Sequence, residues 1–282
     1  MTRCRVCFRH CNLSEGALGF CGARIAENGK TKAYNYGKIT SLALDPIEKK
    51  PLARFMPGSH ILSVGSFGCN LRCPICQNHE ISWSDEAKRF AKEADTLMPG
   101  ELVELALGTR ARGNIGIAFT YNEPLIGYEY VLDTAKLVKD RGLKNVLVTN
   151  GTAEATVLRE LVPYMDAMNI DLQGFSDAYY RNVLGGDRAQ VMAFIEEAVK
   201  HAHVELTTLI VPGENDREEE MRQLSRWVGS LKNPDGEGVP LHITRFFPGF
   251  HMNDRAATDV QVVYHLADVA RENVKYVYVG NC

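Results

Sequence analysis

Gly68-Cys-Asn-Leu-Arg-Cys-Pro-Ile-Cys-Gln-Asn78 is the stretch that decides how this chain of 282 residues is interpreted. It places Cys69, Cys73 and Cys76 in a C-x3-C-x2-C pattern directly after an apolar, strand-like run, 60–67. Structural zinc sites and ordinary iron–sulfur clusters usually take four protein ligands. A compact group of three cysteines instead suits a cluster with one open iron, where a small molecule binds. Three of four zinc ligands, or a C-x2-C redox pair, are the alternatives, because cysteine spacing indicates a metal without naming it.

The composition is ordinary for a globular protein, with 45% apolar and 24% charged residues and a net charge of −3. Lys and Arg are scattered, so nothing predicts nucleic-acid binding. The N-terminus lacks the apolar segment of a signal peptide, and no run approaches the roughly 20 apolar residues that span a bilayer. Clustered cysteines in a chain without export signals indicate metal rather than disulfides. We therefore expect a cytoplasmic protein without membrane contacts.

From residue 58 onward, strand-like and helical patterns alternate. The predicted strands are 61–67, 115–120, 145–149, 167–172, 204–211, 241–245 and 276–279, and the predicted helices are 99–112, 127–141, 152–163, 188–202, 216–231 and 256–272. Repeated βα units form a parallel sheet, and eight of them would close a full barrel. Six units and a final strand therefore predict an α/β fold, a partial (β/α)6 TIM-type barrel over 58–282. Residues 1–57 are predicted to be a cysteine-rich, metal-binding N-terminal extension with a short hairpin at 32–45.

Polar motifs begin where the predicted strands stop. After the cysteine loop these motifs are 120–124, 149–151, 169–173, 207–216 and 242–248. One polar strand end is ordinary turn chemistry, but a series of them is not. Because catalytic groups of parallel barrels gather at the carboxyl ends of the strands, we expect one site there.

Four passages, 55–59, 68–82, 119–124 and 207–216, carry a resemblance to the radical SAM core domain over roughly 58–280. Within that superfamily the chain resembles enzymes that activate pyruvate formate-lyase, and it is most similar to the AmmeMemoRadiSam system radical SAM enzyme branch. The resemblance implies that Cys69, Cys73 and Cys76 hold a 4Fe–4S cluster whose fourth iron binds S-adenosylmethionine. It also implies reductive cleavage of that cofactor to a 5′-deoxyadenosyl radical, which abstracts a substrate hydrogen atom under anaerobic conditions.

The same resemblance implies a set of cofactor-binding residues. They are Ile75, Asn78, Tyr121, Asn122, Glu123, Thr149, Asn150, Asp171, Gln173, Val211 and Arg245. Glu123 occupies the place of a Gly-Gly-Glu motif in which Tyr121 and Asn122 replace the glycines. Gln173 stands where relatives often have Lys, and Ile75 where they often have an aromatic residue against adenine. For Thr149 and Asn150 a plain turn is an alternative, because Asn-Gly is a common turn pair.

Cys4, Cys7, Cys11 and Cys21 form a second group, C-x2-C-x3-C-x9-C, which the branch also carries. Four thiols saturate a tetrahedral zinc site, but the spacing equally allows a second 4Fe–4S cluster. We expect a closed metal site that docks a partner or relays electrons. The sequence assigns no role to Cys282.

Three functions remain open. The first is an activase that abstracts a hydrogen atom from a glycine of a glycyl-radical enzyme. The second is a radical SAM enzyme that modifies a small molecule or another kind of protein residue, with Memo-like and AMMECR-like partners. The third is a non-catalytic zinc-binding interaction protein. Either enzyme would need a flavodoxin- or ferredoxin-type reductant, and the sequence does not identify the substrate.

Overall fold

The main body of the protein is one curved sheet of eight strands. The computed structural model describes residues 1–282, except for the side chain of Ala91. The strands are β6 (Ser41–Pro46), β7 (His60–Gly65), β9 (Asn114–Phe119), β10 (Lys144–Thr149), β11 (Ala167–Asp171), β12 (His203–Ile210), β13 (Leu241–Arg245) and β14 (Val277–Gly280). Their order is β14-β13-β12-β11-β10-β9-β7-β6, and every neighbouring pair is parallel except β6 and β7. This confirms the predicted partial barrel, which is open between β6 and β14.

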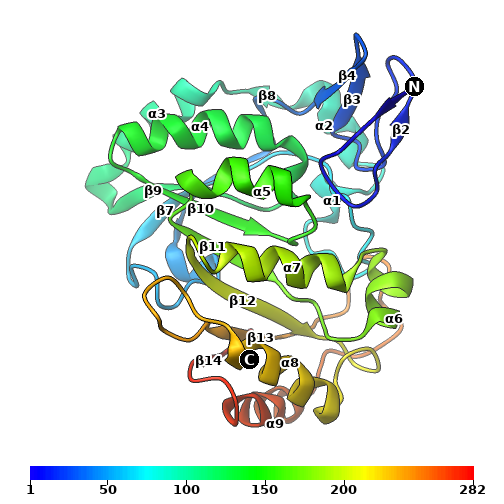
Figure 1. The fold of residues 1–282 in the computed structure, drawn as a ribbon, viewed down its shortest axis with the longest axis vertical. Helices are drawn as coiled ribbons and strands as arrows, with labels where there is room; N and C mark the ends of the chain where they lie inside the picture. The colour runs from blue at the N-terminus through cyan, green and yellow to red at the C-terminus, as the bar shows by residue number, and fades with distance from the viewer.

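Helices follow the parallel strands, as expected for βα units. The helices of the βα units are α3 (Pro99–Gly108), α4 (Tyr128–Asp140), α5 (Ala155–Leu161), α7 (Arg188–Ala198), α8 (Glu218–Ser230) and α9 (Val260–Arg271). Each lies inside a predicted range, and Figure 1 shows α3, α4, α5 and α7 along the outer side of the sheet. The short helices α1 (His79–Ser82), α2 (Ala87–Glu93) and α6 (Asp177–Tyr179) were not predicted. None of the helices described is both long and apolar enough to cross a membrane.

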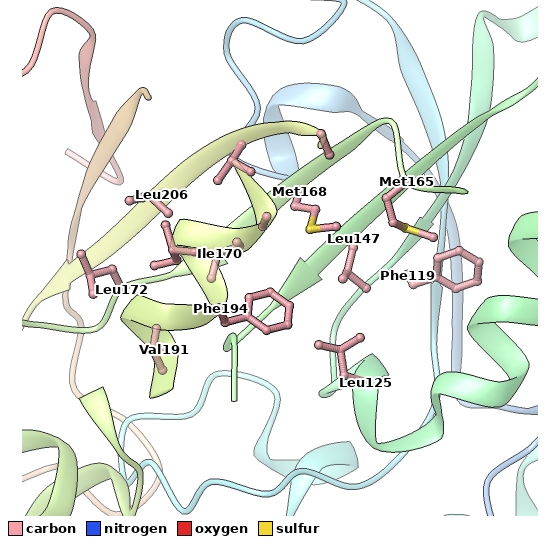
Figure 2. Packing of buried hydrophobic residues seen from close by; sticks show 14 of the residues in the cluster. Phe119, Leu125, Leu147, Met165, Met168, Ile170, Leu172, Val191, Phe194 and Leu206 are labelled. Carbon is pink, nitrogen blue, oxygen red and sulfur yellow. The ribbon is translucent and has the colours of Figure 1, made fainter. Parts of the chain in front are cut away.

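The two faces of the sheet carry different side chains, because successive residues of a strand point to opposite sides. Toward the helices the strands present Leu147, Met168 and Ile170, which pack with Phe194 of α7 (Figure 2). Only part of the inner face of the sheet is apolar, and it forms a smaller cluster. That cluster contains Ile47, Leu52, Ile61, Ala118, Val146 and Ala167. The remaining inner positions include polar residues, and these form the wall of the site described below.

The N-terminal segment consists of short strands near α1 and α2 (Figure 1). They are β1 (Thr2–Arg3), β2 (Asn12–Leu13), β3 (Arg24–Glu27), β4 (Lys30–Ala33) and β5 (Lys38–Ile39), and β5 pairs with β8 (Asp95–Thr96). The predicted hairpin at 32–45 is wrong, since β4 pairs with β3 and β6 pairs with β7. Alternating polar and apolar residues identify an extended segment, but they do not identify the strand with which it pairs. Because β6 belongs to the main sheet, part of 1–57 is continuous with the barrel.

Candidate active site

A cavity of about 780 Å³ opens at the carboxyl ends of the parallel strands. The predicted site residues on its wall are Cys69, Cys73, Ile75, Cys76, Asn78, Tyr121, Asn122, Glu123, Thr149, Asn150, Asp171 and Gln173. Two predicted contacts lie elsewhere. Val211 is fully buried in a cluster with Ile75 and Met252. The Arg245 guanidinium donates to the Thr258 carbonyl at 2.7 Å, and Arg245 is not part of the cavity wall.

The cysteine loop starts at Gly68, where any side chain would force neighbouring atoms to move. Gly68 has φ +93°, and a Cβ on it would lie 2.6 Å from the Cys21 carbonyl oxygen. Burial raises the pKa of the thiols of Cys69, Cys73 and Cys76. Among the described residues, no three Cys, His, Asp or Glu side chains are arranged to hold a single metal ion. The three thiols nevertheless line one cavity, and thiolates there would be stabilised by the cationic irons of a cluster.

Glu123 is held in one orientation by three donors. Its carboxylate accepts hydrogen bonds from the Thr149 hydroxyl at 2.7 Å and from the backbone amides of Asn150, at 2.8 Å, and Leu125, at 3.0 Å. Burial nevertheless raises its pKa to about 7. The strand-end residues of β10 therefore fix the Glu123 carboxylate at the cavity wall rather than forming an independent turn.

Asp171 ends β11 and faces the same cavity. Burial, together with the charge of Glu123, raises its pKa to about 7. Neither carboxylate has an ion pair among the described residues. Two carboxyl groups of raised pKa beside three thiols suit a ligand that brings positive charge, such as an ammonium or sulfonium group. The residues present therefore fit both a cluster and S-adenosylmethionine.

Tyr121 and Asn122, which replace two glycines of the family motif, have defined structural roles. Tyr121 adopts φ +71°, a left-handed conformation that favours glycine, and its hydroxyl donates to Asp45 of β6 at 2.7 Å. The Asn122 side chain donates to the carbonyls of Phe67 and Gly68, at 3.1 Å each. Asn122 thus ties the end of β9 to the start of the cysteine loop.

The N-terminal cysteines Cys4, Cys7, Cys11 and Cys21 line a second, much smaller cavity of about 10 Å³. That volume is about what one water molecule occupies. Burial raises the pKa of Cys7, and it raises that of Cys21 to about 12. The remaining thiol, Cys282, is exposed.

One residue buried in the barrel, Glu205, was not among the predicted site residues. Glu205 is fully buried on β12 and accepts hydrogen bonds from His242 Nε2 at 2.6 Å and His203 Nε2 at 3.0 Å. It also accepts from the amide nitrogens of Ala53 and Arg54. His242 lies on the cavity wall. The sequence signal was an ionisable residue within each of two apolar strands. It can be recognised only once it is known which side of each strand faces inward.

An open parallel barrel with three cysteines after its first parallel strand defines a class of radical enzymes. The sequence profile described as the Radical SAM superfamily matches residues 63–225. The chain belongs to this superfamily.

Two sequence relatives and one solved structure illustrate what this chain is similar to. An uncharacterized protein of Methanocaldococcus jannaschii, MJ0808, is 38% identical over 99% of this chain and 81% of its own length. The pyruvate formate-lyase 1-activating enzyme of Escherichia coli is 25% identical over 62% of this chain and 71% of its own length. The crystal structure of Streptococcus suis SuiB bound to S-adenosylmethionine matches with a TM-score of 0.60 and 9% identity, over 79% of this chain and 52% of SuiB. The last supports the fold alone.

Proposed function

We propose that this protein cleaves S-adenosylmethionine reductively and abstracts a hydrogen atom from a substrate, in the manner of the pyruvate formate-lyase activating enzymes. One observation carries the proposal: three cysteines share one cavity at the carboxyl ends of the strands with two carboxyl groups that have no cationic partner among the described residues. Cys69, Cys73 and Cys76 would hold a 4Fe–4S cluster. When bound, the cluster supplies one electron that splits the cofactor into methionine and the 5′-deoxyadenosyl radical that attacks the substrate.

The chain's own residues would orient the cofactor and exclude water. Glu123, held by hydrogen bonds from Thr149 and Asn150, would accept hydrogen bonds from the ammonium group. Asp171 would add negative charge on the same wall. Ile75 and Leu209 supply apolar surface on the cavity wall. At position 75 an isoleucine replaces the aromatic residue that relatives often have.

The test is anaerobic reconstitution followed by reduction with dithionite in the presence of S-adenosylmethionine. Wild type should bind about four irons at the loop and release 5′-deoxyadenosine. Cys73→Ala should lose both properties, whereas Cys282→Ala, which removes an exposed thiol, should keep them. Release of 5′-deoxyadenosine by Cys73→Ala would refute the ligand assignment.

Glu123→Gln tests the cofactor site separately. Loss of one charge-assisted hydrogen bond is worth about 1.5–3 kcal/mol, so the dissociation constant of S-adenosylmethionine should rise roughly tenfold or more. The exposed Glu80→Gln is the matched control and should bind as wild type does. An unchanged dissociation constant in Glu123→Gln would remove Glu123 from the site.

A second candidate is the modification of a small polar molecule or of a protein residue other than glycine. The observation that favours it is His242, which faces the cavity and is held by a buried carboxylate. A glycine has no side chain for such a group to recognise. Incubation with a peptide containing a deuterated glycine separates the two, because deuterium enters 5′-deoxyadenosine only if glycine is the hydrogen donor.

The partners are proposals too. A flavodoxin- or ferredoxin-type reductant follows from the need for a single electron. Memo-like and AMMECR-like partners follow from the branch resemblance. The N-terminal cysteines are proposed to hold zinc or a second 4Fe–4S cluster, and metal analysis distinguishes four irons with one zinc from eight irons.

A further inference from the structure

The two cysteine groups lie against each other and share a polar bridge. The Asn150 side chain donates to Asn70 Oδ1 at 3.0 Å and to the Cys69 thiol at 3.8 Å. The Asn70 side chain donates to the Thr152 hydroxyl at 2.7 Å, and Asn70 lines the same small cavity as Cys7. Two amide side chains therefore lie between a thiol of the N-terminal group and a thiol of the loop.

Arg9 is the charged part of the same contact. Its guanidinium donates to the Asn70 carbonyl at 2.6 Å and to the Gly185 carbonyl at 2.7 Å. Arg9 also lines the small cavity of the N-terminal cysteines, and Asn70, whose carbonyl it contacts, directly follows Cys69. A single guanidinium thus lies beside the N-terminal thiols and contacts the backbone of the cysteine loop.

The surrounding backbone and side chains hold Arg9 in place. The ring of Phe20 lies between two guanidinium groups, 3.5 Å from that of Arg9 and 3.8 Å from that of Arg72. Arg72 in turn donates to the Cys69 carbonyl at 2.8 Å and to the Phe20 carbonyl. The Glu154 amide nitrogen donates to the Val6 carbonyl at 2.9 Å. The N-terminal segment is therefore attached to the cysteine loop on several sides.

We propose that Arg9 and Asn70 are positioning residues through which the N-terminal cysteine group controls the loop cluster, fixing the loop and raising its reduction potential. The proposal rests on the proposed function, because it needs a cluster at Cys69, Cys73 and Cys76. A positive charge and amide donors near cluster sulfurs favour the reduced, more negative state. The arrangement would serve the delivery of an electron to the loop cluster whether the N-terminal group holds zinc or iron.

The experiment is a redox titration of the reconstituted full-length protein, followed by electron paramagnetic resonance without S-adenosylmethionine. The loop signal is the one that disappears in Cys73→Ala. Arg9→Gln removes the charge and Asn70→Asp replaces an amide donor with a carboxylate, so both should shift the midpoint potential to more negative values. Arg9→Lys, which keeps the charge, should restore most of the shift. Arg5→Gln, an exposed residue of the same segment, should match wild type.

Potentials of Arg9→Gln and Asn70→Asp equal to wild type would overturn the proposal, as would an equal shift in Arg5→Gln. Loss of loop iron in Arg9→Gln that Arg9→Lys restores would support it, provided that the thermal unfolding of both variants is unchanged. The redox titration requires only that the loop cluster is bound, not that S-adenosylmethionine is cleaved. If wild type binds iron but releases no 5′-deoxyadenosine, the proposed function fails while the shift in potential can still be measured.

Discussion

At the scale of single residues, the cavity contains an unfavourable charge. Asp171 has no hydrogen bond or ion pair among the described residues, and burial and Glu123 raise its pKa to about 7. A carboxyl group whose pKa rises on folding binds more protons in the folded state. It therefore destabilises the fold as pH increases from its unfolded pKa, near 3.8, to about 7. Such a cost is expected where a site is built for a positively charged ligand.

Asp171→Asn should remove this cost in the protein without cofactor. One pKa unit corresponds to about 1.4 kcal/mol, and allowing for the partial exposure of Asp171 we expect a gain of roughly 2 kcal/mol at pH 8. The gain should shrink progressively between pH 7 and about pH 4. Thermal unfolding of wild type and Asp171→Asn across this range measures it. A stability difference that does not change with pH would contradict the assigned cause, and S-adenosylmethionine should stabilise the variant less than wild type.

At the scale of elements, the sequence predicted the barrel strands and long helices because each repeats a period that burial imposes. It also predicted that polar strand ends would meet, since the carboxyl ends of parallel strands share one edge. It could not predict contacts that depend on strand partners. β6 looked like half of a hairpin, and the bonds of Tyr121 to Asp45 and of Asn150 to Asn70 join segments that only the folded chain brings together.

The attachment of β6 depends on a buried ion pair. Lys50 Nζ lies 2.9 Å from Asp45, and the Lys50 side chain is 3% exposed. Although burial acts to raise it, hydrogen bonds from Lys50 and Tyr121 hold the pKa of Asp45 well below its usual range. Asp45 is therefore expected to be charged at all moderate pH values and to neutralise Lys50.

Asp45→Asn should leave the Lys50 ammonium buried without a countercharge and lower the free energy of unfolding by roughly 3 kcal/mol. Lys49→Ala is the matched control. Lys49 also reaches Asp45, at 3.4 Å, but is 67% exposed, so its loss should cost no more than about 0.5 kcal/mol. Urea denaturation monitored by circular dichroism compares the two. Equal effects would mean that burial does not decide the strength of these pairs.

At the scale of the whole molecule, the cysteines contribute little to the core: only Cys4 belongs to the large apolar cluster, and Cys11 and Cys73 pack against it. The large apolar cluster between the sheet and the helices includes Leu147, Ile170 and Phe194 (Figure 2). Its strands pair with one another from β7 to β14 without using either cysteine group. The N-terminal segment, in contrast, has two-stranded pairs and a small core, a size of structure that commonly needs metal to fold.

If both cysteine groups hold metal, as proposed, its removal should loosen residues 1–22 and 68–78 and leave the barrel folded. After chelation under anaerobic conditions, we expect hydrogen exchange to increase in residues 1–22 and 68–78, while amides of β9 to β12 stay protected. Far-ultraviolet circular dichroism should change little, because the lost segments contain few helical residues. Cooperative loss of protection throughout β9 to β12 would contradict this separation and make the metal sites part of the folding of the whole chain. Unchanged exchange in residues 1–22 would show that the N-terminal cysteines are not needed to order their own segment.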